Sequence, residues 1–286
     1  MAVETTVTLR HGLGRARTRH REAVVRALTG ADEARLAELG PGASPAARAT
    51  ALIAATTAAI GKVAPVTEDD ARGLTAGDRE RLILSVYERT FAKPLEAVAR
   101  CPAEGCGETL EFAFGVDEVL AEPPARAPGD DARTLEVPVE GTVLKVRFRL
   151  ARGADQEAAA RIAGRDPARA ADVVLEGCVL GVEDGAGRAV TPVSVLADLR
   201  APLAEAMARL DPEAETAVRA PCPACGADIV ALIDAQSFVD NELSRPGGIF
   251  GEVDRLARTY HWAEADILAL SVARRRRYLA LAAGTA

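Results

Sequence analysis

Two spacings of apolar residues alternate along this chain, a period of two typical of strands and a period of about 3.6 typical of helices. One period-two segment runs from residue 3 to 9 and another lies around 22–28. His11-Gly-Leu-Gly14 between them has the composition of a turn, so we predict an N-terminal hairpin. A further alternating segment, Leu135–Leu150, is interrupted at Glu140-Gly141, which predicts a second hairpin.

Segments of helical spacing account for most of the remaining chain. Thr29, Thr75 and Ser271 precede such segments in the position of helix-opening residues, and Gly61 is in the position of a terminator. The predicted helices cover residues 32–39, 46–61, 75–87, 154–164, 168–180, 195–210, 249–260 and 271–281. Together the two spacings predict an α+β fold that is mostly helical, with short β-hairpins.

Four of the five cysteines lie in two short motifs, Cys101-Pro-Ala-Glu-Gly-Cys106-Gly and Cys222-Pro-Ala-Cys225-Gly. A tight turn followed by glycine can direct two thiolates inward, and four thiolates at tetrahedral corners are a preferred ligand set of zinc. An alternating segment and then a short helical segment follow each motif at matching offsets. We therefore predict a split zinc ribbon of two knuckle-strand halves, with Zn²⁺ bound by Cys101, Cys106, Cys222 and Cys225; two disulfides or four free thiols are the alternative.

The separation of the two motifs bears on what the metal would do. Residues 107–221 lie between Cys106 and Cys222, so one ion would join distant parts of the chain and reduce the loop entropy of the folded state. Four cysteines also fill the coordination shell and leave no position for a reactive water. The predicted zinc is therefore structural.

We divide the chain into five segments at the motifs. A Pro-rich stretch, 122–129, opens the segment between the two ribbon halves. The segments are an N-terminal hairpin plus helices (1–95), the first half of the zinc ribbon (96–121), an α+β insert (122–216), the second half of the zinc ribbon (217–236) and a C-terminal helical unit (237–286).

Motif content argues against an enzyme. The sequence has no Gly-x-Ser-x-Gly, His-Glu-x-x-His, phosphate loop or dinucleotide fingerprint. His11, His20 and His261 leave few candidates for acid–base chemistry near neutral pH. Cys178 stands in an apolar run and is expected to be a buried core thiol. We predict no catalytic residue, no cofactor beyond zinc and no small-molecule substrate.

Charge and hydropathy limit the partners and the location. The net charge of −7 makes a nucleic-acid partner unfavourable. The chain has no apolar run long enough for a membrane span, and its first ten residues lack the features of a signal peptide. A cytoplasmic setting is expected, in which paired cysteines favour metal over disulfides.

Two C-terminal features are candidates for partner binding. Tyr260 and Trp262 belong to the main aromatic cluster, which we expect to be a packed helix corner, with a partner hot spot as the alternative. The run Arg274, Arg275, Arg276 and Arg277 covers a full helical turn, so its side chains cannot form one flat patch. We expect a solvated face with one or two inward salt bridges; docking onto an acidic partner or RNA is the alternative.

The order of motifs resembles a known family. The two cysteine motifs, the Leu-Glu-Phe strand, Phe238–Leu243, Val253–Leu270 and Arg275–Leu279 are similar to bacterial proteins of the baseplate hub assembly chaperone family, of the T-even phage type. That family occurs in gene clusters for contractile phage tails and phage-tail-like contractile injection systems. Leu28–Asp32 and Leu74–Arg79 match recurring pieces of it, whereas Ala263 replaces an expected serine cap.

The resemblance implies a non-enzymatic assembly factor or structural component of a baseplate, located in the cytoplasm or within an assembled tail-like particle. Its partners would be other baseplate or tail proteins, bound through the C-terminal helices. The alternative from another class is a zinc-ribbon protein that binds nucleic acid, since Arg274–Arg277 could contact phosphate.

Overall fold

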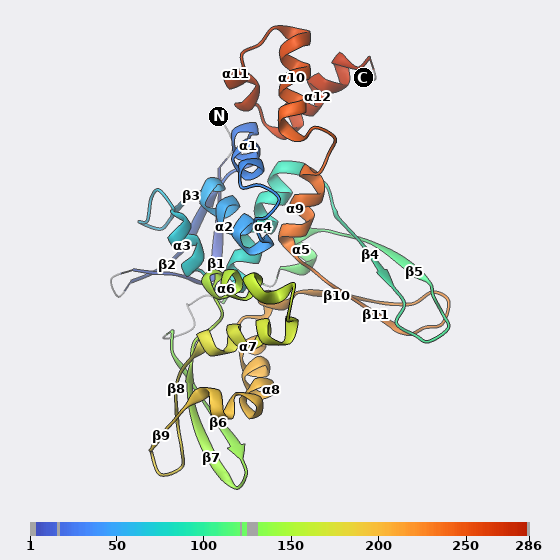
Figure 1. Cartoon of the computed structure of the whole chain (residues 1–286). Coiled ribbons are helices and arrows are strands. Elements are labelled where there is room, and N and C mark those ends of the chain that lie inside the picture. The colour runs from blue at the N-terminus through green and yellow to red at the C-terminus, as the bar shows by residue number, and fades with distance from the viewer. Residues whose placement is uncertain (1–3, 16–17, 121, 125–130, 285–286) are drawn as a thin grey trace.

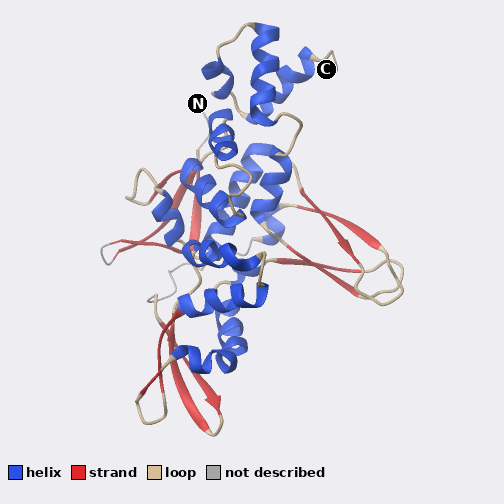
Figure 2. Ribbon diagram, in the orientation of Figure 1, coloured by secondary structure: helices blue, strands red, loops and turns tan. Residues whose placement is uncertain are grey.

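The computed structural model of the chain describes residues 4–15, 18–120, 122–124 and 131–284 (Figure 1). The expected start of the first strand at residue 3 and most of the Pro-rich stretch 122–129 lie outside these residues. Helices account for 48% and strands for 26% of the residues, which confirms a mixed α+β fold (Figure 2). The strands are more extensive than we expected for a mostly helical chain with short hairpins.

The N-terminal part contains a three-stranded antiparallel sheet in the order β1 (Thr5–Arg15), β2 (Thr18–Val25) and β3 (Thr57–Ile60). The hairpin between β1 and β2 was predicted, but its turn was placed wrongly. Residues 11–14 continue β1, which extends to Arg15 and pairs there with Thr18 at the start of β2.

A β-bulge explains why residues 11–14 have the composition of a turn. The register of β1 against β2 shifts around Gly12, whose φ is +71°. A β-carbon at Gly12 would lie 2.3 Å from the backbone oxygen of His20, so this position requires glycine. The buried carboxylate of Asp78 accepts hydrogen bonds from the backbone N–H groups of residues 10–12. This irregularity therefore bends a continuous strand rather than reversing the chain.

The N-terminal part also contains the helices α1 (Gly30–Glu38) and α2 (Pro45–Thr56), which lie between β2 and β3 in the sequence, and α3 (Glu68–Gly73) and α4 (Ala76–Phe91), which come after β3. Thr29 and Thr75 cap α1 and α4 as predicted, each accepting an N–H bond on its side chain. The predicted helix 46–61 is too long, because residues 57–60 leave α2 to pair with β2 as β3.

Each cysteine motif lies in the turn of an antiparallel hairpin. The hairpins are β4 (Leu95–Arg100) with β5 (Thr109–Phe114), and β10 (Ala217–Pro221) with β11 (Asp228–Leu232). Each leads into a helix, α5 (Val116–Val119) or α9 (Ala235–Leu243), as the repeat predicted. The strands before the motifs, β4 and β10, were not predicted. The two hairpins contact each other and project together from the helices; we call this unit the ribbon arm (Figure 1).

The insert folds around a hydrophobic core of its own, in which Val146, Phe148 and Leu199 have at most 1% of their surface exposed. Its sheet has the order β6-β7-β8-β9. The elements are β6 (Arg133–Val139), β7 (Thr142–Phe148), α6 (Gly153–Ala163), α7 (Pro167–Cys178), β8 (Val179–Glu183), β9 (Ala189–Val190), α8 (Pro192–Leu210) and the 3-10 helix η1 (Pro212–Glu215).

The hairpin predicted in the insert is present. Glu140 and Gly141 form its two-residue turn and both have positive φ, as a type I′ turn requires. The helix predicted over 168–180 ends at Cys178, because Val179 begins β8 and pairs with β7.

The C-terminal unit lies at the end of the molecule opposite the insert (Figure 1). From here on the name covers α10 (Gly248–Tyr260), α11 (Glu264–Leu268) and α12 (Val272–Ala282), whereas α9, most of which lies in the predicted segment 237–286, packs against α4. Ser271 caps α12 through its side chain, as predicted, and Ala263 begins α11 without a side-chain cap. The backbone N–H of Gly30 donates to the carbonyl of Leu270, which joins this unit to the start of α1.

Candidate metal centre

The four cysteines of the two motifs meet at the tip of the ribbon arm. Their Sγ atoms all lie within 4.8 Å of one another. The Sγ atoms of Cys101 and Cys225 are 3.6 Å apart, and those of Cys106 and Cys222 are 3.7 Å apart. Zinc–sulfur bonds of about 2.3 Å at tetrahedral angles place sulfurs about 3.8 Å apart. Two of the sulfur separations therefore match those of a tetrahedral site, and all four thiols are close enough to share one metal ion.

Both close pairs join one motif to the other. All five cysteines of the chain are free thiols, and these sulfur separations are far longer than the roughly 2.05 Å of a disulfide bond. A metal in this position would bind both hairpins at once. It would thus close the tip of the ribbon arm across the 115 residues (107–221) that separate the motifs.

The turns that present the thiols have matching backbone geometry. The N–H of Cys101 donates to the carbonyl of Glu108 at 2.7 Å, and the N–H of Cys222 donates to that of Ala227 at 2.8 Å. Gly107 and Gly226, which follow the second cysteine of each motif, have φ values of +70° and +76°. The glycine in each motif thus occupies a left-handed position that other residues adopt only with strain.

The thiols differ in acidity before any metal binds. Burial raises the pKa of Cys222, but the N–H groups of Cys225 and Ala224 outweigh it and lower the pKa to about 7. The N–H of Ala103 lowers the pKa of Cys101, but burial and the neighbouring thiols outweigh it and raise the pKa to about 12. Cys222 can therefore lose its proton near neutral pH, whereas the positive charge of a metal would be needed to deprotonate Cys101.

The donor set fits zinc in a structural role. Four soft thiolates match the preference of Zn²⁺ and fill its tetrahedral shell, so the ion would hold the two turns together and bind no substrate. The inner faces of the hairpins beneath the cluster are apolar, and Phe112, Ile229 and Ala231 are buried there. The fifth thiol, Cys178, lies apart in the insert, where it is fully buried as predicted and burial raises its pKa to about 12.

The aromatic residues singled out in the sequence form a packed corner. The rings of Tyr260 and Trp262 stack with centroids 4.8 Å apart, and Tyr278 of α12 packs edge-on against Trp262 at 4.8 Å. His261 ends α10 with a φ of +56°. These ring contacts pack the end of α10 against α12. The side chains of Tyr260 and Trp262 are half-buried.

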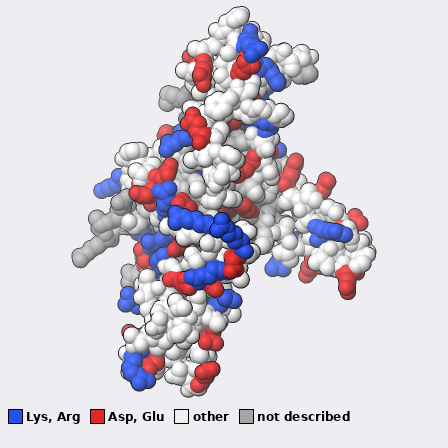
Figure 3. Space-filling view, in the orientation of Figure 1, with Lys and Arg blue, Asp and Glu red and all other residues white. Residues whose placement is uncertain are grey.

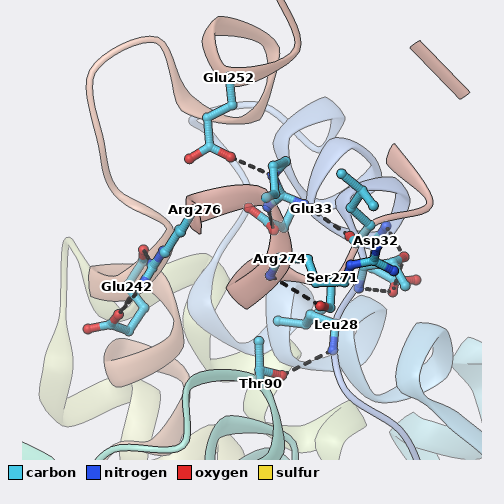
Figure 4. A network of polar contacts seen from close by, with 12 residues as sticks. Leu28, Asp32, Glu33, Thr90, Glu242, Glu252, Ser271, Arg274 and Arg276 are labelled. Atoms are coloured by element: carbon cyan, nitrogen blue, oxygen red, sulfur yellow. Dashed lines mark hydrogen bonds and ion pairs between the residues drawn. The ribbon is translucent and has the colours of Figure 1, made fainter. Parts of the chain in front are cut away.

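The four consecutive arginines point in different directions, as the helical spacing requires. Arg274 and Arg277 are exposed. Arg276 contacts Glu242 at 3.2 Å, as Figure 4 shows, and its guanidinium lies 5.5 Å from the centre of the Phe91 ring. Arg275 is fully buried. We therefore remove Arg275 from the candidate partner-binding residues, because its side chain lies in the core and is inaccessible to another protein.

Arg275 belongs to an ion network that the sequence did not reveal. It contacts Glu33 of α1 and, at 2.5 Å, Glu252 of α10; Figure 4 shows where these two carboxylates lie. Arg245 contacts the same two carboxylates, each at 2.5 Å. The network joins α1 to the C-terminal unit. Its members are up to 242 residues apart, so sequence spacing carried no signal for it.

The remaining surface is mixed in charge. On the face seen in Figure 3, cationic and anionic side chains alternate over the insert, the helices and the C-terminal unit. Within the described ranges, no helix combines the length and apolar content needed to cross a membrane. No family model, curated protein or solved structure matches the chain.

Proposed function

We propose that this chain is a non-enzymatic assembly factor or structural component of the baseplate of a phage-tail-like contractile particle, and that its four-cysteine cluster holds a structural zinc ion. The geometry of the cluster is the observation that supports the metal. The similarity of the C-terminal segments to the baseplate hub assembly chaperone family supports the role.

The arrangement of modules suits a protein that binds other proteins. The ribbon arm, the insert and the C-terminal unit project in different directions from the helices around α4 (Figure 1). Each carries exposed apolar side chains, such as Leu232 on the arm, Val193 in the insert and Phe250 in α10. A protein with several projecting surfaces can contact more than one subunit, which assembly factors and structural subunits both require.

The alternative role in nucleic-acid binding has less support. Two of the four arginines that could contact phosphate, Arg275 and Arg276, are engaged with carboxylates. The ribbon arm is itself acidic over residues 95–114 and 217–232, where the charged side chains are Glu96, Arg100, Glu104, Glu108, Glu111, Arg219 and Asp228. Phosphate contact through this arm would be electrostatically unfavourable.

The assembly role is tested by recovering a tagged copy of the protein from its native cells after mild lysis and identifying its partners by mass spectrometry. Purified tail-like particles are analysed in parallel. We expect baseplate or tail proteins in the tagged sample and not in an untagged control. Their absence, or recovery of nucleic acid that is lost at high salt, would contradict the proposal. Presence of the chain in finished particles distinguishes a subunit from an assembly factor.

A further inference from the structure

Each of the two close sulfur pairs at the tip of the ribbon arm combines a buried thiol with a more accessible one. In the first pair, Cys101 has 6% of its surface exposed, whereas Cys225 is exposed. In the second pair, Cys222 has 3% of its surface exposed, whereas Cys106 is half-buried. An oxidant from solvent would therefore meet one thiol of each pair first, with a shielded thiol beside it.

This arrangement is typical of cysteines that form a disulfide after oxidation by a peroxide. Hydrogen peroxide converts the accessible thiol to a sulfenic acid and releases one water molecule. The shielded thiol then attacks that sulfur, which forms the disulfide and releases a second water molecule. In total, two thiols lose two electrons and two protons, and one peroxide molecule becomes two water molecules.

Four cysteines can pair in three ways, and the geometry of the cluster selects one of them. Pairing Cys101 with Cys222 would join the two buried thiols, neither of which is readily reached by the oxidant. Pairing within each motif would join an accessible thiol to a buried one, but the contacts at 3.6 and 3.7 Å run between the motifs. The expected disulfides are therefore Cys101–Cys225 and Cys106–Cys222.

Contacts that do not involve sulfur hold the two motifs in position. The N–H groups of Cys101 and Cys222 donate to backbone carbonyls on the far side of their turns, at 2.7 and 2.8 Å. Beneath the cluster, buried apolar side chains of both hairpins, among them Phe112 and Ile229, belong to the main hydrophobic core. From 3.6 or 3.7 Å, a short movement brings a sulfur pair to the roughly 2.05 Å of a disulfide bond.

We propose that the four-cysteine cluster is also a site of oxidative modification, at which a peroxide joins Cys101 to Cys225 and Cys106 to Cys222 when the thiols carry no metal ion. The disulfides would link residues 124 and 116 positions apart and fasten one hairpin to the other. They would then hold the tip of the ribbon arm closed in place of a metal. The inference rests on the cluster of the proposed function, but it requires neither bound zinc nor a baseplate partner.

The pairing is tested by peptide mapping of the full-length protein. The protein is stripped of metal, reduced, treated with hydrogen peroxide, alkylated and digested with trypsin without further reduction. Each motif lies within a single tryptic peptide, so we expect the two peptides to be joined in one species. Tandem mass spectrometry should then assign the pairs Cys101–Cys225 and Cys106–Cys222. Cys178, which is fully buried in the insert, is an internal control and should remain a free thiol.

A matched pair of variants tests the two disulfides separately. Cys225→Ser should still form the disulfide between Cys106 and Cys222 and leave Cys101 as a free thiol. Cys178→Ser removes a thiol outside the cluster and should form both disulfides. Circular dichroism checks that each variant folds; if Cys225→Ser does not, the map of the wild type decides.

Hydrogen exchange tests the consequence for the ribbon arm. In the oxidised protein, we expect amide exchange in β4, β5, β10 and β11 to be at least about tenfold slower than in the reduced, metal-free protein, because the disulfides limit opening of the arm. Exchange in β6–β8 should be the same in both forms.

Separate tryptic peptides, each with a disulfide inside its own motif, would overturn the proposal. Pairing of Cys101 with Cys222, or equally fast exchange of the arm in the oxidised and reduced forms, would also overturn it. Zinc content is measured on untreated protein and tests the proposed function alone. Its outcome leaves the peptide map unchanged, because the metal is removed before oxidation.

Discussion

Arg275 shows how a single residue in a run of four identical ones can have a distinct role. Its side chain has no exposed surface and lies between Glu33 and Glu252, whereas Arg274, one position earlier, is exposed. The sequence indicated that one or two of the four would turn inward but could not say which. The choice depends on carboxylates from α1 and α10 that lie far away in the chain.

Replacing Arg275 by alanine should destabilise the protein strongly. Glu33 and Glu252 would remain buried with less compensation, which costs about 3–5 kcal/mol when one partner of a buried ion network is removed. The matched Arg274→Ala, on the same helix but exposed, should change the free energy of unfolding by less than about 0.5 kcal/mol. Urea unfolding measures both. Similar small effects from the two substitutions would contradict the burial of Arg275.

Asp211 gives a prediction about pH. Burial raises its pKa from 3.8 to about 7, and the nearby carboxylates of Asp78 and Glu213 add to this against the N–H bond from Gly77. The folded state therefore retains a proton that the unfolded state loses between about pH 4 and 7. Over that range the contribution of this group to stability falls as pH rises, and above it the contribution is constant.

Asp211→Asn removes this titration and can still accept the N–H bond from Gly77. The variant should gain stability relative to the wild type as pH rises from about 4 to about 7. His11, 3.6 Å away, has its pKa lowered to about 4 by burial, but it is present in both proteins and its effect cancels to first order in the difference. Urea unfolding at a series of pH values gives this difference. A difference that does not vary with pH would contradict the shifted pKa.

At the scale of elements, the sequence predicted best where spacing alone sets the structure. The cysteine motifs, the strands after them and the turn at Glu140-Gly141 followed from local chemistry. The strand before the first motif, Leu-Glu-Ala-Val-Ala-Arg100, is rich in alanine and charged residues that favour helices, so its identity as β4 depends on pairing with β5. Residues 57–60 also continue the helical spacing of the sequence. They form β3 because they pair with the edge of β2.

The separate cores of the elements predict a local response to metal removal. The ribbon arm packs against the main core, whereas β6, β7 and β8 enclose the core of the insert. If zinc is bound, removing it with a chelator should speed amide hydrogen exchange in β4, β5, β10 and β11 and leave β6–β8 protected. Hydrogen exchange read by mass spectrometry resolves these segments. An equal loss of protection in the insert would contradict the independence of its core.

At the scale of the whole molecule, the contacts between distant segments of the chain could not be predicted from the sequence. The ion network that ties Glu33 to Arg275 and the contact between Arg19 and Asp131 both bring together residues from distant segments. Charged residues are common along the chain, and neither periodicity nor spacing selects these partners. The cysteine cluster was predictable at equal range because cysteines are rare and their motif is specific.

The central claim, that one zinc ion joins the two hairpins, is tested most directly by native mass spectrometry with metal analysis of the purified protein. We predict one zinc per chain in the wild type and in Cys178→Ala, whose altered thiol lies outside the cluster. Cys222→Ser should lose the ion and become poorly soluble. A folded wild type with two disulfides or four reactive thiols and no metal, or a Cys222→Ser variant that keeps zinc at full affinity, would contradict the claim.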